Sequence, residues 1–153
     1  MFTGTFTALV TPFNADGSVD YTALRALVQW QTENGVEGLV AVGTTGESPT
    51  LDVEEHIRVI TTTVEAAAGK AQVIAGTGAN ATSEAIELTR AVLGSGVAAT
   101  LQVTPYYNKP NAEGLFRHFA AVADLGLPVM LYNVPGRSGK EIPLDVVVRL
   151  ASY

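Results

Sequence analysis

Short apolar runs alternate along the chain with longer stretches in which apolar residues recur at helical spacing. The runs are apolar at nearly every position rather than at every second one. They are Phe6–Val10, Gly38–Val42, Gln72–Ala75, Thr100–Val103 and Val129–Tyr132. Strands that are buried on both faces of a parallel sheet have this pattern, whereas half-exposed strands alternate apolar and polar residues. The runs therefore predict five parallel strands.

The stretches between the runs predict helices. Asp20 is a candidate N-cap, Asp52 precedes Glu55 at capping-box spacing, and Gly69 and Gly94 follow two of the stretches. Pro143 is a favoured first-turn residue. We expect helices over Tyr21–Glu33, Val53–Ala68, Ser83–Leu93, Glu113–Ala123 and from Pro143 to the last residue.

Strand and helix repeat in units of similar length. Thr44, Thr77, Thr104 and Tyr132 mark successive strand ends, at intervals of 33, 27 and 28 residues, which is the length of one strand-plus-helix unit. No linker interrupts residues 1–153, so we expect a single α/β domain. Two architectures fit: a complete doubly wound sheet, or the first five units of a (β/α)8 TIM barrel, whose full form needs about 250 residues. Both place a functional site in the loops that follow the strands.

Composition narrows the functional classes. No apolar stretch approaches the roughly 20 residues that cross a bilayer, and no secretory leader is visible, so we expect neither a membrane partner nor a signal peptide. The chain has no cysteine, which excludes disulfides and thiolate chemistry and suits a reducing cytoplasm. With a net charge of −6 and no basic cluster, we expect no nucleic-acid partner.

The loop after the second strand, GTTGES at positions 43–48, is rich in groups that bind anions. Its glycines let the backbone turn tightly and present N–H groups, and its hydroxyls can donate as well. A carboxylate or phosphate cradle is one interpretation, and an ordinary turn is the other. It is not a Walker loop, because no GK[ST] follows.

Two later loops carry further candidates. In TPYYNKP, positions 104–110, Tyr106 and Tyr107 cannot both point into one core, so at least one faces a cavity, a partner or solvent. In YNVPGRSG, positions 132–139, Arg137 offers a planar fork that suits a carboxylate, unless it is a plain surface residue. His56 and His118 fall inside predicted helices without acidic or histidine partners at metal-ligand spacing, so we predict no metal site.

Taken together, the strings LVTPF, VGTTGESPTL, VIAGTGANAT, TPYYNKP, EGLFRHF and LYNVPGRSG, in this order, resemble the dihydrodipicolinate synthases. The resemblance runs from Met1 to Tyr153. GTTGE is shared across the wider family of pyruvate-dependent aldolases, and the YYNKP and NVPGR strings narrow it to the synthases.

The resemblance implies a (β/α)8 barrel, of which this chain is about the first five units. It implies the condensation of pyruvate with aspartate 4-semialdehyde in lysine biosynthesis, through an imine on a lysine and without a cofactor. Thr44, Tyr107 and Tyr132 match the proton relay. Thr45 matches the residue that holds the pyruvate carboxylate, and Arg137 matches the one that binds the semialdehyde carboxylate.

The resemblance also implies assembly and regulation. In the family the residue at Tyr107 reaches into a neighbouring subunit's site, so we expect a homodimer or a tetramer. Free lysine inhibits many members, and the residues that match its site are Ser48, His56, Asn80, Glu84 and Tyr106. Asn80 and Glu84 are equally the residues that begin a helix well.

One departure from the family pattern concerns the nucleophile. The imine lysine of the family follows a sixth strand, and Lys70, Lys109 and Lys140 do not match it, so we expect the chain to be inactive alone. Three alternatives stay open: another pyruvate aldolase such as an N-acetylneuraminate lyase, a non-catalytic half-barrel that binds a small molecule, and a nucleotide-binding doubly wound domain. Against the last, no GxGxxG follows the first strand.

Overall fold

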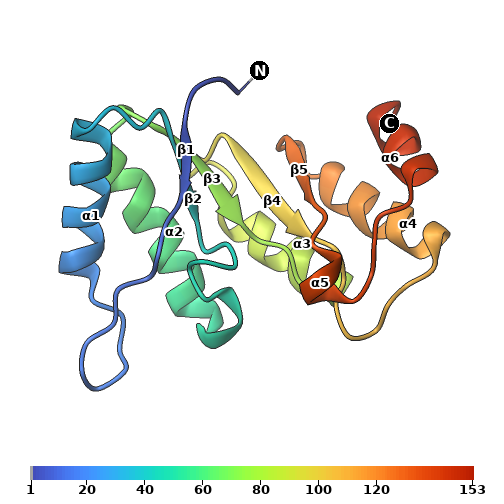
Figure 1. Ribbon diagram of the computed structural model, residues 1–153, viewed down its shortest axis with the longest axis horizontal. Helices are drawn as coiled ribbons and strands as arrows, with labels where there is room; N and C mark the ends of the chain where they lie inside the picture. Colours follow the sequence, from blue (N-terminus) through green and yellow to red (C-terminus); the bar gives the residue numbers. More distant parts are fainter. Residues whose placement is uncertain (1) are drawn as a thin grey trace. The chain divides into compact units, whose positions relative to one another are not determined.

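The computed structural model describes residues 2–153. The backbone forms two compact units. The first runs to Gly76 and includes residues 92–98, and the second comprises residues 77–91 and 99–153. Strands and helices alternate along the chain in both units (Figure 1).

The first unit is a three-stranded parallel sheet with helices against it. Its elements are β1 (Phe6–Ala8), α1 (Tyr21–Glu33), β2 (Gly38–Ala41), the 3-10 helix η1 (Ser48–Thr50), α2 (Val53–Ala67) and β3 (Gln72–Gly76). The strand order is β1-β2-β3, with Phe6 opposite Gly38 and Gly38 opposite Gln72. Helices α1 and α2 pack side by side (Figure 1).

Local signals explain where the helices of this unit begin and end. The Asp20 carboxylate accepts a hydrogen bond from the N–H of Ala23 at 2.9 Å and caps α1. Asp52 and Glu55 form a complete capping box at the start of α2. At its other end the left-handed cap residue is Ala68 rather than the predicted Gly69, which follows it with a positive φ.

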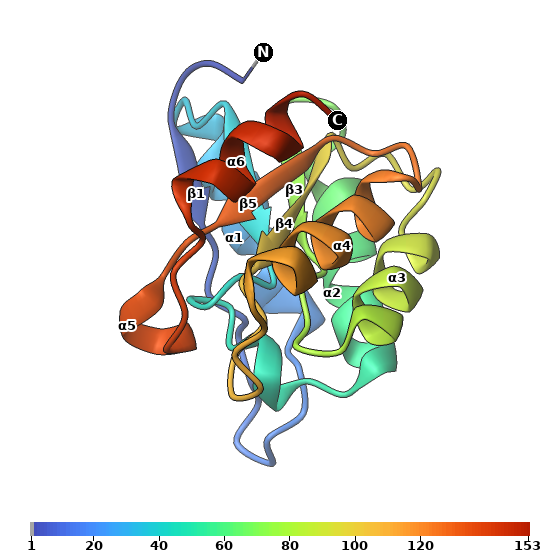
Figure 2. The same ribbon diagram turned by 90° about the vertical axis from the view of Figure 1, so that its right-hand side faces the viewer.

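The second unit contains a parallel strand pair and four helices. Its elements are α3 (Thr82–Ala91), β4 (Ala99–Val103), α4 (Ala112–Ala123), β5 (Val129–Tyr132), the one-turn α5 (Pro135–Ser138) and α6 (Leu144–Ala151). Helix α4 packs on α3 and on α6 (Figure 2). Its core side chains Leu115 and Phe119, both at most 1% exposed, meet Ile142 and Val146.

The structure confirms five parallel strands and five long helices, with ends within two residues of the predictions. The short η1 and α5 were not predicted. The prediction that the strands are buried on both faces is wrong for β1 and β5, because most of their residues are half-buried. Within the first unit β2 lies between β1 and β3, which contradicts a re-ordered doubly wound sheet. The single-domain expectation stays a prediction.

Candidate functional site

The carboxyl end of β2 opens into a tight turn in the first unit. Val42 follows the strand with φ 54°, a left-handed conformation that a β-branched residue rarely adopts. Its carbonyl lies against Gly76, where there is no room for a Cβ. The chain therefore leaves the strand along a fixed path that depends on glycine in the neighbouring strand.

The turn itself leaves backbone donors for a ligand. Its hydrogen bonds come from the N–H groups of Gly46, Glu47 and Ser48, which donate to the carbonyls of Gly43 and Thr44 at 3.1–3.4 Å. The amides of Thr44 and Thr45 take no part in this set. Thr44 is half-buried and Thr45 is exposed. The loop thus carries two amides and two hydroxyls, which are donor types of an anion cradle.

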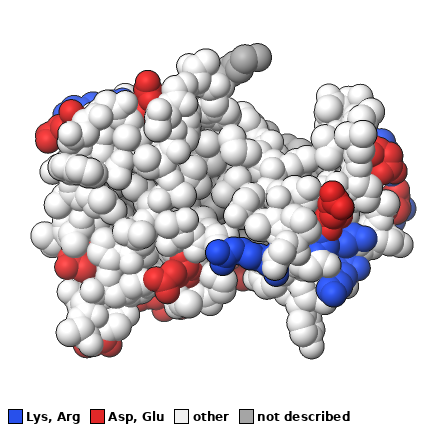
Figure 3. Space-filling model, in the orientation of Figure 1, with Lys and Arg blue, Asp and Glu red and all other residues white. Residues whose placement is uncertain are grey.

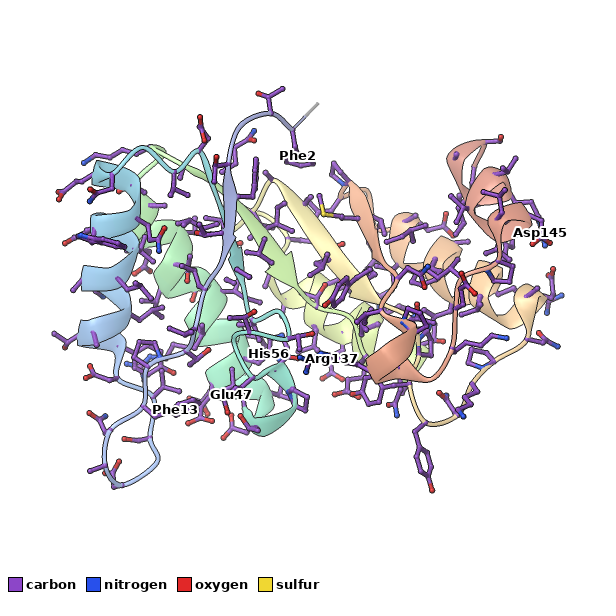
Figure 4. All side chains as sticks on the ribbon, in the orientation of Figure 1. Phe2, Phe13, Glu47, His56, Arg137 and Asp145 are labelled. Atoms are coloured by element: carbon purple, nitrogen blue, oxygen red, sulfur yellow. The ribbon has the colours of Figure 1, made fainter. Side chains whose placement is uncertain are left out.

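A buried hydroxyl and a buried histidine support this turn. Thr11 Oγ1 donates to the carbonyl of Gly46 at 2.7 Å. His56, on α2 and 5% exposed, has Nε2 2.6 Å from the carbonyl oxygen of Gly76. Ser48 begins η1 and is half-buried. Figure 4 shows Glu47 in the loop and His56 on α2. His56 is therefore a buried histidine that contacts a backbone carbonyl within this chain.

In the second unit, the loop after β4 has a strained backbone. The N–H of Asn108 donates to the carbonyl of Tyr106 at 2.8 Å, which closes a three-residue turn around Tyr107. Tyr107 has φ 69° and Lys109 has φ 44°. Left-handed non-glycine residues cost of order 1–3 kcal/mol each and cluster at functional sites. The turn directs the Tyr107 side chain outward, where it is 92% exposed.

A hydrogen bond joins this loop to the segment before α3. The side-chain amide of Asn108 donates to the carbonyl of Asn80 at 2.9 Å. Tyr106 is half-buried, and its pKa is raised by burial and, to a smaller extent, by the negative charge of Glu84. Asn80, Glu84 and Tyr106 therefore lie near one another in the second unit. Tyr106 stays a neutral hydrogen-bond donor at physiological pH.

Tyr132 closes β5 and is held against the end of β4. The N–H and the hydroxyl of Thr104 both point to the carbonyl of Tyr132, at 3.2 and 3.3 Å. Asn133 Oδ1 accepts a hydrogen bond from the N–H of Ile142 at 3.2 Å and ties the strand end to the segment before α6. Thr104 and Asn133 were not predicted as positioning residues, although both stand next to predicted strand ends.

Arg137 lies in the last turn of α5 and is exposed. Figure 4 shows its side chain extending away from the α5 ribbon. It makes none of the ion pairs found within residues 2–153. Its guanidinium is therefore available to a carboxylate.

The structure groups the predicted site residues by unit. The first unit brings Thr44, Thr45 and Ser48 into one loop after β2, with His56 on the helix that follows. The second unit brings the others to the carboxyl ends of its strands and to the beginning of α3; they are Asn80, Glu84, Tyr106, Tyr107, Tyr132 and Arg137.

Sequence reasoning missed a buried polar network in the second unit. Gln102 Nε2 donates to Thr77 Oγ1 at 2.7 Å, and Thr77 and Thr89 share a hydrogen bond of 2.8 Å. Gln102, a polar residue inside a predicted buried strand, was the sequence signal that could have revealed it. In the described part of the chain, no three His, Asp or Glu side chains form a group that could hold a metal ion. No helix there is long and apolar enough to span a membrane.

Comparison with known proteins identifies the family. The Dihydrodipicolinate synthetase family matches residues 1–153. A 4-hydroxy-tetrahydrodipicolinate synthase of Acidithiobacillus ferrooxidans is 57% identical over 152 residues, which are 99% of this chain and 52% of that protein. The chain therefore spans about half the length of the curated relatives it matches.

Solved structures agree with the sequence comparison. The dihydrodipicolinate synthase of Acinetobacter baumannii, solved with pyruvate, superimposes with a TM-score of 0.94 at 52% identity, over 97% of this chain and 51% of that one. The enzyme of Cyanidioschyzon merolae, solved with lysine bound, gives 0.94 at 44% identity over the same shares. The five strand–helix units match the N-terminal half of the family's (β/α)8 barrel. The chain belongs to the dihydrodipicolinate synthetase family.

Proposed function

We propose that this chain supplies the carboxylate-binding loop and the proton-relay tyrosines of a 4-hydroxy-tetrahydrodipicolinate synthase, which condenses pyruvate with aspartate 4-semialdehyde in lysine biosynthesis. The observation that carries the proposal is the strained loop at Tyr107, in which a tyrosine is directed outward by a left-handed backbone that a hydrogen bond between Asn108 and Tyr106 closes. Such strain persists only when the surrounding structure imposes it. We place the reaction in the cytoplasm, which suits a cysteine-free chain.

The loop after β2 is proposed to hold the pyruvate carboxylate. The N–H and hydroxyl of Thr45 donate to it. The hydrogen bonds that hold the tight turn come from other amides, so the amide of Thr45 is left for the ligand. Aimed donors of this kind require no reorganisation during the reaction. The A. baumannii relative was solved with pyruvate, which supports this choice of ligand.

Tyr132, Thr44 and Tyr107 are proposed to move protons. A lysine amine attacks the ketone carbon of pyruvate, and the carbinolamine oxygen leaves as water after it takes a proton. Loss of a methyl proton then gives the enamine, whose carbon attacks the aldehyde carbon, and the aldehyde oxygen takes a proton. Phenols and hydroxyls can pass these protons in both directions without carrying charge at rest. Tyr132 is proposed to act at the imine, and the bonds from Thr104 to its carbonyl hold its backbone at the strand end.

Arg137 is proposed to bind the carboxylate of aspartate 4-semialdehyde, since its guanidinium is exposed and engaged in no ion pair among the described residues. Tyr107, 92% exposed on its own chain, is proposed to complete the relay in a second copy. The working unit is then a dimer or a tetramer.

We also propose lysine as an effector. Asn80, Glu84 and Tyr106 lie together in the second unit, and a carboxylate with an amide and a phenol suits an ammonium group. Ser48 and His56, in the first unit, are assigned to the same ligand by the family resemblance alone. The C. merolae relative was solved with lysine bound, which supports this ligand.

The nucleophile is proposed to come from a lysine beyond the sequence described. Lys70 lies before β3, at the amino end of the strands, and Lys109 and Lys140 are in loops. A catalytic amine needs a pKa lowered by a dry pocket. Without such an amine the chain has no synthase activity by itself, and it acts as a half-barrel that binds small carboxylates.

The test is trapping with borohydride. The purified chain is incubated with pyruvate and sodium borohydride and weighed by mass spectrometry, beside a 4-hydroxy-tetrahydrodipicolinate synthase of A. ferrooxidans as the positive control. We expect the adduct of one reduced pyruvate on the control and none on this chain. An adduct on Lys109 or Lys140 would overturn the assignment of the nucleophile. Absence of pyruvate binding in a parallel NMR titration would overturn the proposed function.

A further inference from the structure

Lys109 lies against the loop that carries Arg137. Its Cε and Nζ lie 3.0 and 3.4 Å from the position that a Cβ of Gly139 would occupy. Gly139 has φ 65° and ends α5, so it follows Arg137 by two residues and precedes Lys140. Residues far apart in the sequence thus bring three cationic side chains to one loop within the second unit.

No carboxylate within residues 2–153 neutralises these cations at close range. The three ion pairs found there join other residues, and none includes Lys109, Arg137 or Lys140. Lys109 also donates no side-chain hydrogen bond among those found there, and it is exposed. Figure 3 shows Lys and Arg atoms on both sides of α5, with one acidic side chain beside them. The acid next in sequence is Glu141, which makes no ion pair either.

We propose that Lys109, Arg137 and Lys140 form an anion-binding surface, and that Lys109 recruits the anion to it. The ligand class is a small anion that carries carboxylate-like charge and accepts hydrogen bonds. This deepens the proposed function, because the same loop holds Arg137, and it assigns a recruiting role to Lys109. Lys109 attracts the substrate carboxylate to the loop before Arg137 binds it.

The local backbone explains why the lysine is held there. Lys109 has φ 44°, which aims the chain away from an extended path. Gly139 has no Cβ, and a Cβ there would meet Cε at 3.0 Å. Only glycine leaves this space and tolerates the positive φ at the same time. The position of the ammonium therefore depends on both residues.

The test uses the 153-residue chain at low ionic strength, with inorganic sulfate as the probe and NMR titration as the readout. Coulomb's law puts the loss of one charge about 7 Å from a dianion at roughly sevenfold in binding in water, less when salt screens it. We expect Lys109→Met to weaken sulfate binding about threefold or more. Lys109→Arg should restore it.

Two variants separate a positioned charge from net charge. Lys70→Met removes the same charge from the first unit, and we expect unchanged sulfate binding. Gly139→Ala keeps every charge but displaces Lys109, and we expect weaker sulfate binding, with circular dichroism to check the fold. Equal losses in Lys109→Met and Lys70→Met would overturn the proposal, and so would a chain that binds no sulfate. If sulfate binding depends on Lys109 but the chain does not bind pyruvate, the anion-binding surface is supported and the proposed function is overturned.

Discussion

The two units carry very different charge. The first has nine carboxylates and three cationic side chains, a net charge of −6, whereas the second has six of each and is neutral. The whole excess of negative charge therefore belongs to the first unit. The net charge of a chain is thus a poor guide to the sign of a local surface.

The second unit is neutral overall but not evenly. Glu113 on α4 accepts hydrogen bonds from Arg117 of the same helix at 2.8 Å and from Arg149 of α6 at 3.1 Å. Its negative charge is therefore already paired with two cations. The cations of the α5 loop have no such partner among the described residues. A neutral unit can therefore present a positive surface, which the acidic composition alone would have argued against.

The units also differ in how well their buried polar groups are satisfied. In the first unit His56 places Nε2 on a carbonyl at 2.6 Å. Among the described residues, the buried side-chain atoms that lack a partner all lie in the second unit; they are Thr100 Oγ1, Gln102 Oε1 and His118 Nε2. Each such group costs about 1–3 kcal/mol. We therefore expect the second unit to be the less stable.

The largest expected effect comes from Phe119→Ala. Phe119 is 1% exposed in the core between α4 and α6, and removal of such a ring costs about 3–5 kcal/mol. That is a large part of the total stability of a typical domain. We expect a lower urea midpoint and faster amide exchange in α4 and α6 than in α1 and α2.

Ile60→Ala is the matched change in the first unit, since Ile60 is also fully buried. We expect a loss of about 2–5 kcal/mol with exchange raised mainly in α1 and α2. If both variants accelerated exchange equally throughout the chain, the two units would unfold as one and the comparison would fail.

A smaller effect is expected from pH, through His118. Burial lowers its pKa below the ordinary 6.5. Nδ1 is 2.9 Å from Thr82 Oγ1, while Nε2 has no partner in the described structure, so protonation adds a buried charge that no partner at Nε2 stabilises. The unfolded chain therefore binds this proton more readily than the folded chain. The stability that neutral His118 contributes is complete above pH 6.5. It is lost as the pH falls from there through the pKa of His118 in the folded chain.

The free energy of unfolding changes through His118 by at most about 1.4 kcal/mol per pH unit, because one proton is involved. Urea unfolding between pH 7 and pH 5 measures it, a range in which most carboxylates stay ionised. His118→Gln should flatten the dependence in this window. An equally steep curve in that variant would show that another group is responsible.

The sequence predicted the regular elements because their signals are local. The α1 boundaries follow from Asp20 and from an apolar period of 3.6, and β5 was predicted at its observed ends. The one-turn α5 was missed because four residues are too few to show a period. Half-burial of β1 and β5 was missed because position at a sheet edge depends on partners rather than on the strand's own residues.

The sequence names candidate members of the site but does not predict their geometry. Resemblance named Tyr107 and Arg137, and apolar patterning placed both after strands. Nothing in the local sequence predicts φ 69° at a tyrosine or the ammonium of Lys109 against Gly139, because both depend on contacts between distant segments. The sequence spacing around His56 could not predict its hydrogen-bond partner, since that partner is the carbonyl of Gly76 in another element.

The smallest expected effect compares the two helix caps. Asp52 accepts a hydrogen bond from the N–H of Glu55 at 2.8 Å, and Glu55 Oε2 accepts one from the N–H of Asp52 at 3.3 Å. Asn111 makes one cap bond, from the N–H of Gly114 at 2.8 Å. We expect Asp52→Ala to cost about 1 kcal/mol or more and Asn111→Ala nearer 0.5 kcal/mol, within the usual range for caps.

The difference between these caps has two sources, a second hydrogen bond and a negative charge at the positive end of the helix dipole. Asp52→Asn separates them, because it keeps the cap bond and removes the charge. We expect it to lose only about 0.3–1 kcal/mol, measured as a shift in the urea midpoint, and less again in high salt. Equal costs for Asp52→Ala and Asn111→Ala would show that the capping box adds nothing beyond a single bond, so that the caps of the two units are equivalent.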